Sequence, residues 1–272
     1  MPSIFQRLLI AGVFAAISFP GAALAWGEKG HEVVAGIAAR HLTDAARSQI
    51  RDLLGGSVED TMMQAANWSH EIEASRPDTR AWHFVDIPVS AEGYSAQRDC
   101  PKGDCAIARM TEEMKTVADK ARPKAERTEA LKYLIGLMGD IHQPLRCGTD
   151  GNDHGRDVKV LLGKEKTDLF QIWDDRVVDA LGGTAGQLVS RLTQDITPEE
   201  RRIWPHGNVT KWCEESAKKA ESAAYADLDG AATEGDRILL NPDYPYAKQK
   251  ITAEQLKKGG LRLAALLNFV LK

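Results

Sequence analysis

The sequence predicts an all-α protein folded as a single helical domain. Apolar residues recur every three or four positions along most of the chain, which is the period of a helix with one buried face. Only two short segments, residues 157–162 and 82–89, favour an extended backbone. No repeat or long linker divides residues 26–272, and 43% apolar residues in a chain of 272 are enough for one substantial core.

Capping residues mark where several of these helices begin and end. Thr43 can cap a helix that ends at Gly55 and Gly56. Residues 197–200, Thr-Pro-Glu-Glu, form a capping box with proline at the first helical position. Apolar stripes predict further helices within residues 107–121, 131–141, 169–177, 212–220 and 252–270.

Residues 1–25 have the features of a cleaved secretory signal. Arg7 precedes an apolar run over residues 8–17, and the segment closes on Ala23-Leu24-Ala25, a small-x-small pattern that signal peptidase accepts. The run is too short for a permanent anchor, which needs about 20 residues. We therefore expect the mature protein to begin at Trp26, to be periplasmic or secreted, and to have no membrane attachment.

The charge of the mature chain is mildly acidic. Loss of Arg7 takes the formal net charge from −4 to −5. Such a protein has no global field that attracts nucleic acid, so any recognition of phosphate must be local.

The four cysteines lie in the mature part, and an even number in an exported chain favours two disulfides over thiol chemistry. Cys100 and Cys105 bracket a turn-forming segment and are expected to pair. Cys147 and Cys213 are then left to pair with each other. A zinc site is the alternative, but the close cysteine spacing typical of zinc sites is absent.

The new N-terminus is a candidate metal ligand. A free amino group and the carbonyl of Trp26 can chelate one cation, and His31 can reach the same ion from the first turn of a helix. The alternative is structural: Trp26 anchors the N-terminus and His31 is a surface histidine.

A second candidate is Asp140, at the end of the apolar helix in residues 131–141. A buried carboxylate is costly unless it is paired or bound to metal, and its two oxygens can bridge two cations. His142, two residues later, is expected to be a structural donor.

Residues 67–72 and 82–87 hold the remaining candidates. His70 and His83 can supply ring nitrogens to a metal, although a structural role is the alternative for His83. Asp86 can accept a hydrogen bond from an attacking water. Phe84 can belong to the core or stack on a base.

The order of these segments resembles that of the S-one/P-one type of zinc nuclease, kin to the zinc-dependent phospholipases C. The pair Cys100–Cys105 also looks like a disulfide of that family. The resemblance implies a helical fold, three zinc ions in a cleft, and cleavage of single-stranded DNA and RNA to products with 5′-phosphates. The segments that carry it are Trp26 with His31, 82–86, 139–145, Trp173-Asp174 and Trp212-x-x-Glu215-Ser216.

The resemblance also implies which residues hold zinc. The neighbouring second site would share Asp140 and use His83, with His70 at a position where the family has aspartate. The family's other histidine of that site is replaced by Gly136, which has no side chain to ligate. The first site is complete, with ligands from Trp26, His31 and Asp140.

The third site departs most from the family pattern. Arg146 and Phe170 stand where the family has histidines, so only Asp174 remains, and one carboxylate does not hold zinc. We therefore expect one or two zinc ions rather than three. Glu73 replaces an arginine thought to steady the leaving group, and residues 154–156, His-Gly-Arg, replace Gly-Gly-Asn.

Arg146 has two interpretations. Its guanidinium can supply a fixed positive charge that binds phosphate oxygens in place of the lost metal. It can instead merely neutralise Asp174 or Asp140.

These residues predict an exported, monomeric, zinc-dependent endonuclease for single-stranded DNA or RNA. Asp86 would orient the attacking water, Arg146 would steady the developing charge, and Phe84 would stack on a base. One alternative is a non-catalytic family member that binds phosphate-bearing ligands, and another is a hydrolase similar to phospholipase C. The metal ligands would come from Trp26, His31, His70, His83, Asp140 and Asp174.

Overall fold

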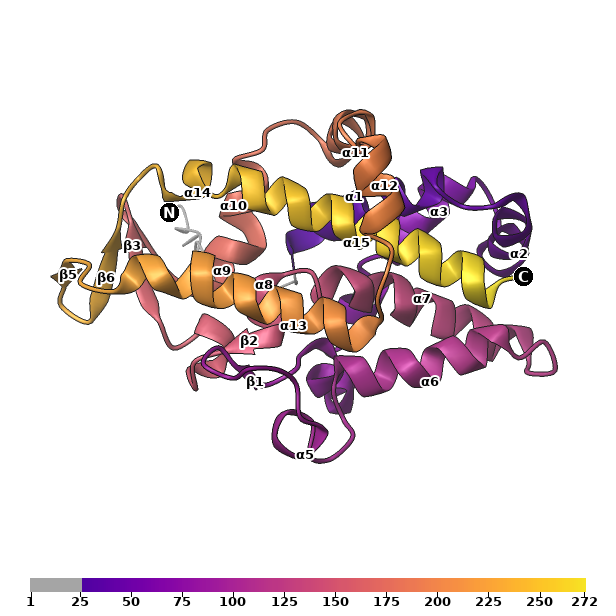
Figure 1. Ribbon diagram of the computed structural model, residues 1–272, viewed down its shortest axis with the longest axis horizontal. Coiled ribbons are helices and arrows are strands. Elements are labelled where there is room, and N and C mark those ends of the chain that lie inside the picture. The colour runs from indigo at the N-terminus through magenta and orange to yellow at the C-terminus, as the bar shows by residue number, and fades with distance from the viewer. Residues whose placement is uncertain (1–25) are drawn as a thin grey trace, which may run out of the picture.

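The computed structural model describes residues 26–272, and the predicted signal segment 1–25 lies outside the described residues. Helices make up most of the molecule, as Figure 1 shows, and the predicted all-α class is confirmed. Helix α1 (Gly27–Arg40) packs against α15 (Gln249–Val270), α3 (Val58–Ala65) and α11 (Ala185–Gln194). The N-terminal and C-terminal helices therefore share one core.

Helix α7 (Lys124–Asp140) carries the most deeply buried segment. It packs along α6 (Ala106–Ala118) and also contacts α1, and every residue from Tyr133 to Asp140 is buried. The chain leaves the helix at Asp140 and starts the short α8 (Pro144–Cys147) at a proline. Asp140 thus lies inside the protein, at the end of a helix.

Local capping set the helix ends as predicted. Thr43 accepts a hydrogen bond from Ala46 N at the start of α2 (Asp44–Leu54), and Gly55 ends the helix with φ +77°. The predicted capping box is present at Thr197, before α12 (Pro198–Ile203). The last helix begins at Gln249, three residues before the predicted start at Thr252.

Most of the remaining helices are short. Between Leu169 and Asp179 the chain forms an unbroken series of helical turns, α9, η3 and α10, with the π-helix η3 at its centre. These elements are α4 (Trp68–Glu71), the 3-10 helices η1 (Pro77–His83), η2 (Asp153–Gly155) and η5 (Ala226–Leu228), α5 (Ala96–Asp99), α9 (Leu169–Gln171), the π-helices η3 (Ile172–Arg176) and η4 (Ala220–Tyr225), α10 (Val177–Asp179), α13 (Val209–Lys219) and α14 (Tyr244–Ala247).

A small sheet was only partly predicted. Strand β3 (Lys159–Leu162) falls in one predicted extended segment and lies between β4 (Glu165–Asp168) and β6 (Arg237–Leu240), with β5 (Thr233–Glu234) outside β6. The other predicted segment was largely wrong, because Trp82 belongs to η1. Only β1 (Ile87–Pro88) is extended there, paired with β2 (Gly148–Thr149). The strands that were missed are short and carry charged residues, so they give little periodic signal.

Both predicted disulfides are present. Cys100 pairs with Cys105, and Cys147 pairs with Cys213, with Cα atoms 5.7 and 5.5 Å apart. The second bridge ties the end of α8 to α13, and so fixes the segment that follows Asp140 against a long helix. Between residues 26 and 272, no helix is both long and apolar enough to cross a bilayer.

Candidate active site

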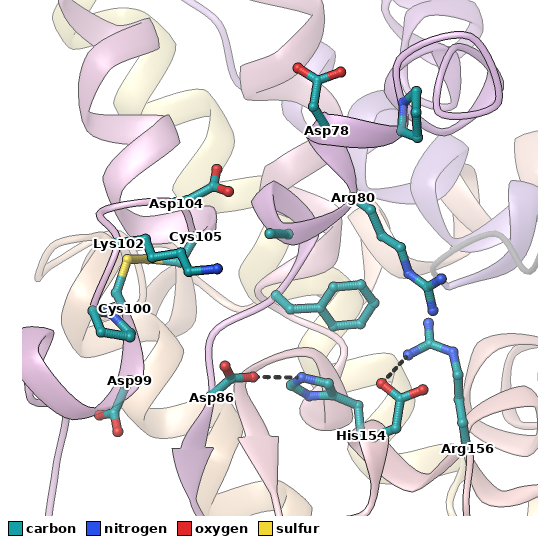
Figure 2. Close-up of a pocket in the computed structure, with 15 residues that line it drawn as sticks. Asp78, Arg80, Asp86, Asp99, Cys100, Lys102, Asp104, Cys105, His154 and Arg156 are labelled. Carbon is teal, nitrogen blue, oxygen red and sulfur yellow. Dashed lines mark hydrogen bonds and ion pairs between the residues drawn. A yellow bond between two sulfur atoms is a disulfide. The ribbon is translucent and has the colours of Figure 1, made fainter.

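An open pocket of about 450 Å³ lies between η1, the Cys100–Cys105 loop and η2. Phe84 and Asp86 line it from the segment after η1, and His154 and Arg156 line it from η2 and the residue that follows. Arg80 reaches in from η1, and Figure 2 shows its guanidinium pointing toward that of Arg156. The pocket therefore combines an aromatic ring with three cationic side chains, those of Arg80, Lys102 and Arg156, and five aspartates also line it. The ring and the cations are groups that can contact a nucleotide.

Asp86 does not stand free in this pocket. Its Oδ1 lies 2.9 Å from Nε2 of His154, and the other ring nitrogen of His154 lies 2.8 Å from the carbonyl of Leu145 (Figure 2). This bond to His154 holds the pKa of the Asp86 carboxyl below its usual value, although partial burial opposes the shift. The Asp86 side chain is still 66% exposed, so it remains available to a ligand in the pocket.

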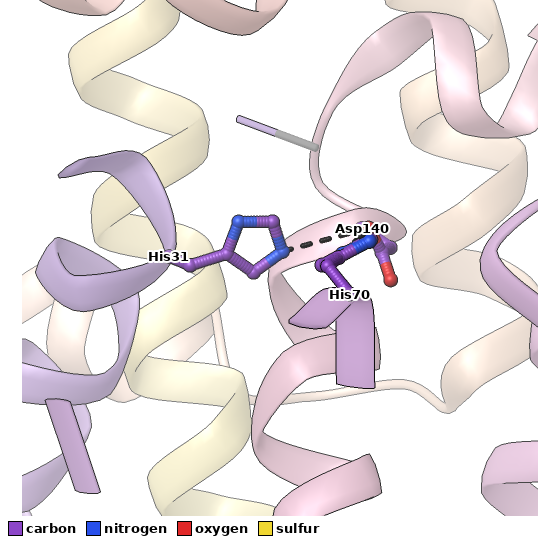
Figure 3. Close-up of side chains that lie close together, drawn as sticks. All are labelled: His31, His70 and Asp140. Carbon is purple, nitrogen blue, oxygen red and sulfur yellow. Dashed lines mark hydrogen bonds and ion pairs between the residues drawn. The ribbon is translucent and has the colours of Figure 1, made fainter. Parts of the chain in front are cut away.

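A buried cluster of polar side chains lies behind Phe84, with Asp140 at its centre. One oxygen of Asp140 lies 3.1 Å from Nε2 of His70 and 3.5 Å from Nε2 of His31, and the other lies 2.7 Å from Nδ1 of His83. Figure 3 shows His31, His70 and Asp140 close together, with the ring of His31 directed toward the other two side chains. These four side chains, the metal-centre cluster, are all at most 2% exposed.

Close helix packing brings the cluster together. His31 lies on α1, His70 on α4 and His83 at the end of η1, and all three surround the last residue of α7. A Cβ atom at Gly139 would lie 2.5 Å from the ring of His31, so only glycine lets α1 approach α7 this closely. The glycine beside Asp140 is thus needed for the histidine to reach the carboxylate.

The electrostatics of the cluster favour a neutral His70 beside an ionised Asp140. Burial holds the pKa of His70 well below its ordinary value, so the ring is neutral at pH 7. Burial also opposes ionisation of Asp140, but the neighbouring histidines and Arg146 outweigh this and keep the pKa of Asp140 well below the usual range. Arg146 carries the permanent positive charge among these neighbours.

The cluster leaves several buried polar atoms without hydrogen-bond partners. Among residues 26–272, these include Nε2 of His31, Nδ1 of His70 and Nε2 of His83. Buried polar atoms are nearly always bonded, and a bound ion is one of the standard explanations when they have no partner in the protein. Neutral imidazoles and an ionised carboxylate are the ligand forms that zinc requires, so these residues fit the metal.

Arg146 occupies the space between two carboxylates. Its side chain is 2% exposed, with Nε 3.7 Å from Asp140 and Nη2 3.7 Å from Asp174. Its guanidinium also lies 4.4 Å from the ring of Phe84 and 4.8 Å from that of Phe170. A buried cation in this place offsets the negative charge of the two acids.

Asp174 connects this cation to the N-terminus of the described chain. Its Oδ1 accepts hydrogen bonds from the backbone nitrogen of Trp26 at 3.2 Å and from Gln143 at 2.7 Å. Burial raises the pKa of Asp174 to about 7, against the opposing charge of Arg146. The Trp26 nitrogen thus points toward the π-helix η3, which carries Asp174.

The structure places the predicted site residues in two adjoining groups. Phe84 and Asp86 line the open pocket. The buried group contains the three histidines and Asp140, with Arg146 joining them to Asp174 and Trp26. Sequence reasoning missed Arg80, which lines the pocket. It named Glu73 only as the replacement of a family arginine, whereas the folded chain brings Glu73 close to His70 and His83.

Comparison with known proteins agrees with this arrangement. The profile of one family, described as S1/P1 Nuclease, matches residues 26–272. The chain belongs to the S1/P1 nuclease family. It is 28% identical over 285 residues to Endonuclease 3 of Arabidopsis thaliana, covering 96% of this chain and 94% of that protein. It is 30% identical to Endonuclease 2 of the same plant, with 89% of each chain covered.

A fungal relative extends the comparison. Nuclease S1 of Aspergillus oryzae is 25% identical over 269 residues, covering 90% of this chain and 91% of that enzyme. The family predicted from the sequence is thus confirmed, together with its helical fold and its enzyme class, a nuclease.

Proposed function

We propose that the chain is an exported, zinc-dependent endonuclease that hydrolyses single-stranded DNA or RNA to products with 5′-phosphates, using fewer than three metal ions. The observation that carries this proposal is the convergence of three buried histidines on Asp140, beside an open pocket with arginine and aromatic side chains. Membership of the S1/P1 nuclease family supports the same reaction class.

In this proposal His31, His70, His83 and Asp140 hold zinc, and the amino group of Trp26 joins them once the chain begins at that residue. When bound, zinc supplies Lewis-acid charge that activates water and stabilises charge on phosphate oxygens. Trp26 has φ +45°, a conformation that costs a non-glycine residue free energy within a chain. A residue at the N-terminus has no preceding peptide unit, so cleavage before Trp26 would remove this cost.

Arg146 keeps the remaining cluster compact where the third metal is lost. Its charge lies between Asp140 and Asp174 and stabilises both as anions without a cation from solution. Because the side chain is almost fully buried, its effect on the scissile phosphate is electrostatic, acting across the ring of Phe84. In this arrangement Asp174 lacks, among the described residues, the further ligands that would be needed to hold a third zinc ion with it.

The pocket binds and orients the strand. The ring of Phe84 offers a surface for a base, and the guanidinium groups of Arg80 and Arg156 face the same space and pair with phosphate oxygens. Asp86, held in place by His154, accepts a hydrogen bond from the water that attacks. A single strand suits an open pocket of this kind because its bases are free to stack on a side chain.

Export and a monomeric state complete the proposal. The two disulfides favour an oxidising compartment, in line with the predicted signal at residues 1–25 and a periplasmic or secreted location.

The test is metal content together with cleavage of a defined strand. The exported protein, with its first residue identified by mass, is expected to contain one or two zinc ions. It should cleave a single-stranded oligonucleotide faster than its duplex. Chelation should abolish cleavage and zinc should restore it, and phosphatase treatment of the products should release 5′-phosphate.

A different result would favour another function. The filling of the third metal region by Arg146 is the observation that supports a non-catalytic member binding phosphate-bearing ligands. A folded protein that contains no zinc and cleaves neither nucleic acid nor phosphatidylcholine would support that function. Cleavage of phosphatidylcholine alone would support a hydrolase similar to phospholipase C.

A further inference from the structure

A second group of ligand-forming side chains shares two histidines with the metal-centre cluster. It consists of His70, Glu73 and His83, and each offers a ligand atom within 4.8 Å of the others. The rings of His70 and His83 lie close together, with centroids 4.1 Å apart and planes tilted by 33°. One nitrogen of each ring faces Asp140, and within the described part of the chain the other nitrogen of each ring is free for a different partner.

The free edge carries unpartnered nitrogens. Nε2 of His70 and Nδ1 of His83 face Asp140, whereas Nδ1 of His70 and Nε2 of His83 are buried and have no hydrogen-bond partner among residues 26–272. A buried ring nitrogen without a partner is costly, and two side by side point to a ligand that accepts both lone pairs. A divalent cation meets this description.

Glu73 brings a carboxylate to the same place. It lies one turn beyond His70, where its backbone N–H donates to the carbonyl of His70 at 3.2 Å, so the two side chains extend on the same side of the turn. The side chain is half-buried, and no hydrogen bond or ion pair holds it in the part of the chain that the structure describes. A carboxylate that is oriented but unpaired is available to a cation.

The region around Gly136 explains why a ligand from another position is needed. A Cβ atom at Gly136 would lie 2.5 Å from Oγ of Ser69 and 3.1 Å from the carbonyl of Ala66. The hydroxyl of Ser69 therefore fills the space beside α7 where a side chain at position 136 would begin. Position 136 therefore offers no ligand to the two histidines, and within residues 26–272 Glu73 is the carboxylate besides Asp140 that lies within reach of both.

We propose that His70, Glu73 and His83 form a divalent-metal site, with Glu73 as a ligand. Two imidazoles and one carboxylate are a ligand set that zinc uses in catalytic sites, where a fourth position stays open. The inference deepens the proposed function and rests on it for the identity of the ion as zinc. It adds a ligand from outside the residues that the family resemblance assigns.

The experiment compares two neighbouring glutamates in the exported, zinc-loaded protein. Glu73→Gln keeps the size of the side chain but removes its charge, and Glu71→Gln is the matched control, because Glu71 is exposed on the same short segment. Zinc per chain is measured by elemental analysis after dialysis against a competing chelator. We expect Glu73→Gln to lose one zinc equivalent, or to hold it at least tenfold more weakly, and Glu71→Gln to match the unsubstituted protein.

A second variant keeps the test decisive if Glu73→Gln folds poorly. Glu73→His supplies a nitrogen ligand in place of oxygen, so it should retain the zinc and change the visible absorption spectrum of the cobalt(II)-substituted protein. An unchanged cobalt spectrum in Glu73→His would overturn the proposal, as would full zinc retention by a folded Glu73→Gln. Either result would leave the proposed nuclease standing. Absence of zinc from the unsubstituted protein would instead contradict the proposed function itself.

Discussion

The metal-centre cluster and a second polar network lie on opposite sides of residues 139–145, and the two differ in how their polar atoms are paired. The second network, called the rear network, consists of His142, Glu215, Ser216, Gln255, Lys258 and Arg262. In it, Nδ1 of His142 bonds the carbonyl of Met138 at 2.8 Å, and Nε2 of His142 accepts a hydrogen bond from Arg262 at 3.0 Å. Burial lowers the pKa of His142 to about 3, so the ring stays neutral. Both of its nitrogens are therefore used, as its predicted structural role requires.

The rest of the rear network is also mostly satisfied. The hydroxyl of Ser216 bonds the carbonyl of Ile141, and Gln255 donates to the carbonyl of His142 at 3.0 Å. Arg262 and Lys258 of the last helix both pair with Glu215. Only Oε1 of Gln255 lacks a partner within this part of the described chain. The metal-centre cluster, in contrast, has three histidine nitrogens without partners among the described residues. The contrast indicates that the metal-centre cluster is built to bind a ligand and the rear network to stabilise the fold.

The largest expected effect is that of Asp140→Asn. The change removes the negative charge that three histidines face and leaves the buried Arg146 with a single carboxylate partner, so it should lower the free energy of unfolding by about 3–5 kcal/mol. Zinc content and cleavage should also be lost. Urea unfolding and elemental analysis measure both effects. Retention of all bound zinc in this variant would contradict the assignment of Asp140 as the centre of the cluster.

The rear network should respond in stability alone. Glu215→Gln should lower the free energy of unfolding at pH 7 by about 2–3 kcal/mol, less than for a fully buried pair because the side chain is 29% exposed. Burial raises the pKa of Glu215, but Arg262 and Lys258 outweigh it and lower the value from 4.5 to about 2. A lowered pKa in the folded state means that this stabilisation is complete above about pH 4.5 and is lost as the pH falls to 2.

The stability difference between Glu215→Gln and the unsubstituted protein should therefore shrink below pH 4.5. Zinc per chain should not change. The matched control is Glu199→Gln, whose carboxylate pairs with Arg202 on the exposed surface of α12 and should contribute at most about 0.5 kcal/mol. A loss of zinc in Glu215→Gln would mean that the two networks are coupled and not separate.

The N-terminal ligand gives the next effect. One additional residue before Trp26 in the mature protein converts the amino group to an amide, so we expect loss of one zinc equivalent or an affinity at least tenfold weaker. The free energy of unfolding of the metal-free protein should change little. Unchanged zinc content in the extended protein would eliminate the amino group as a ligand.

Gly136→Ala tests the packing of α4 against α7 beside the metal-centre cluster. The added methyl group would meet Oγ of Ser69 at 2.5 Å, so unfolding should become easier by about 1–2 kcal/mol despite the higher helix propensity of alanine. The double variant Gly136→Ala with Ser69→Ala should recover much of this loss. Equal stability of Gly136→Ala and the unsubstituted protein would show that Ser69 moves away readily.

Much of the fold followed from the sequence because helix signals are local. The capping residues Thr43 and Thr197 stand within three residues of the groups that they bond, so the pattern alone predicts them. The strand pairing of β3 with β6 joins Val160 to Ile238, residues far apart in the chain, and no local pattern reveals such a contact. Short strands of this kind depend on the packing of the helices around them.

The site divides in the same way. Asp140 was predictable because an acid at the end of an apolar helix conflicts with its surroundings. The approach of Glu73 to His83 was not, since it depends on how α4 and η1 fold back on each other. The sequence also could not decide between the two interpretations of Arg146. Its burial between two carboxylates now favours neutralisation of Asp140 and Asp174 over direct binding of phosphate.

The smallest expected effect concerns the open pocket lined by Phe84 and Arg156. Arg156 stacks on Phe170, with its guanidinium 3.7 Å from the ring, and lines the open pocket together with Arg80. Arg156→Gln should raise KM for a single-stranded oligonucleotide about tenfold, which corresponds to about 1.4 kcal/mol, with kcat and zinc content little changed. Arg156→Lys, which keeps the charge but loses the planar fork, should fall between the two.

Salt dependence identifies the cause of that change. A lost phosphate contact lowers the slope of log affinity against log salt concentration by about 0.7 for a single strand, whereas a lost stacking contact leaves the slope unchanged. Arg202→Gln is the control, because Arg202 is exposed on α12 and pairs only with Glu199 among the described residues. An unchanged slope in Arg156→Gln would mean that Arg156 packs on Phe170 and does not contact phosphate. Phosphate would then be bound through Arg80 and the metal-centre cluster.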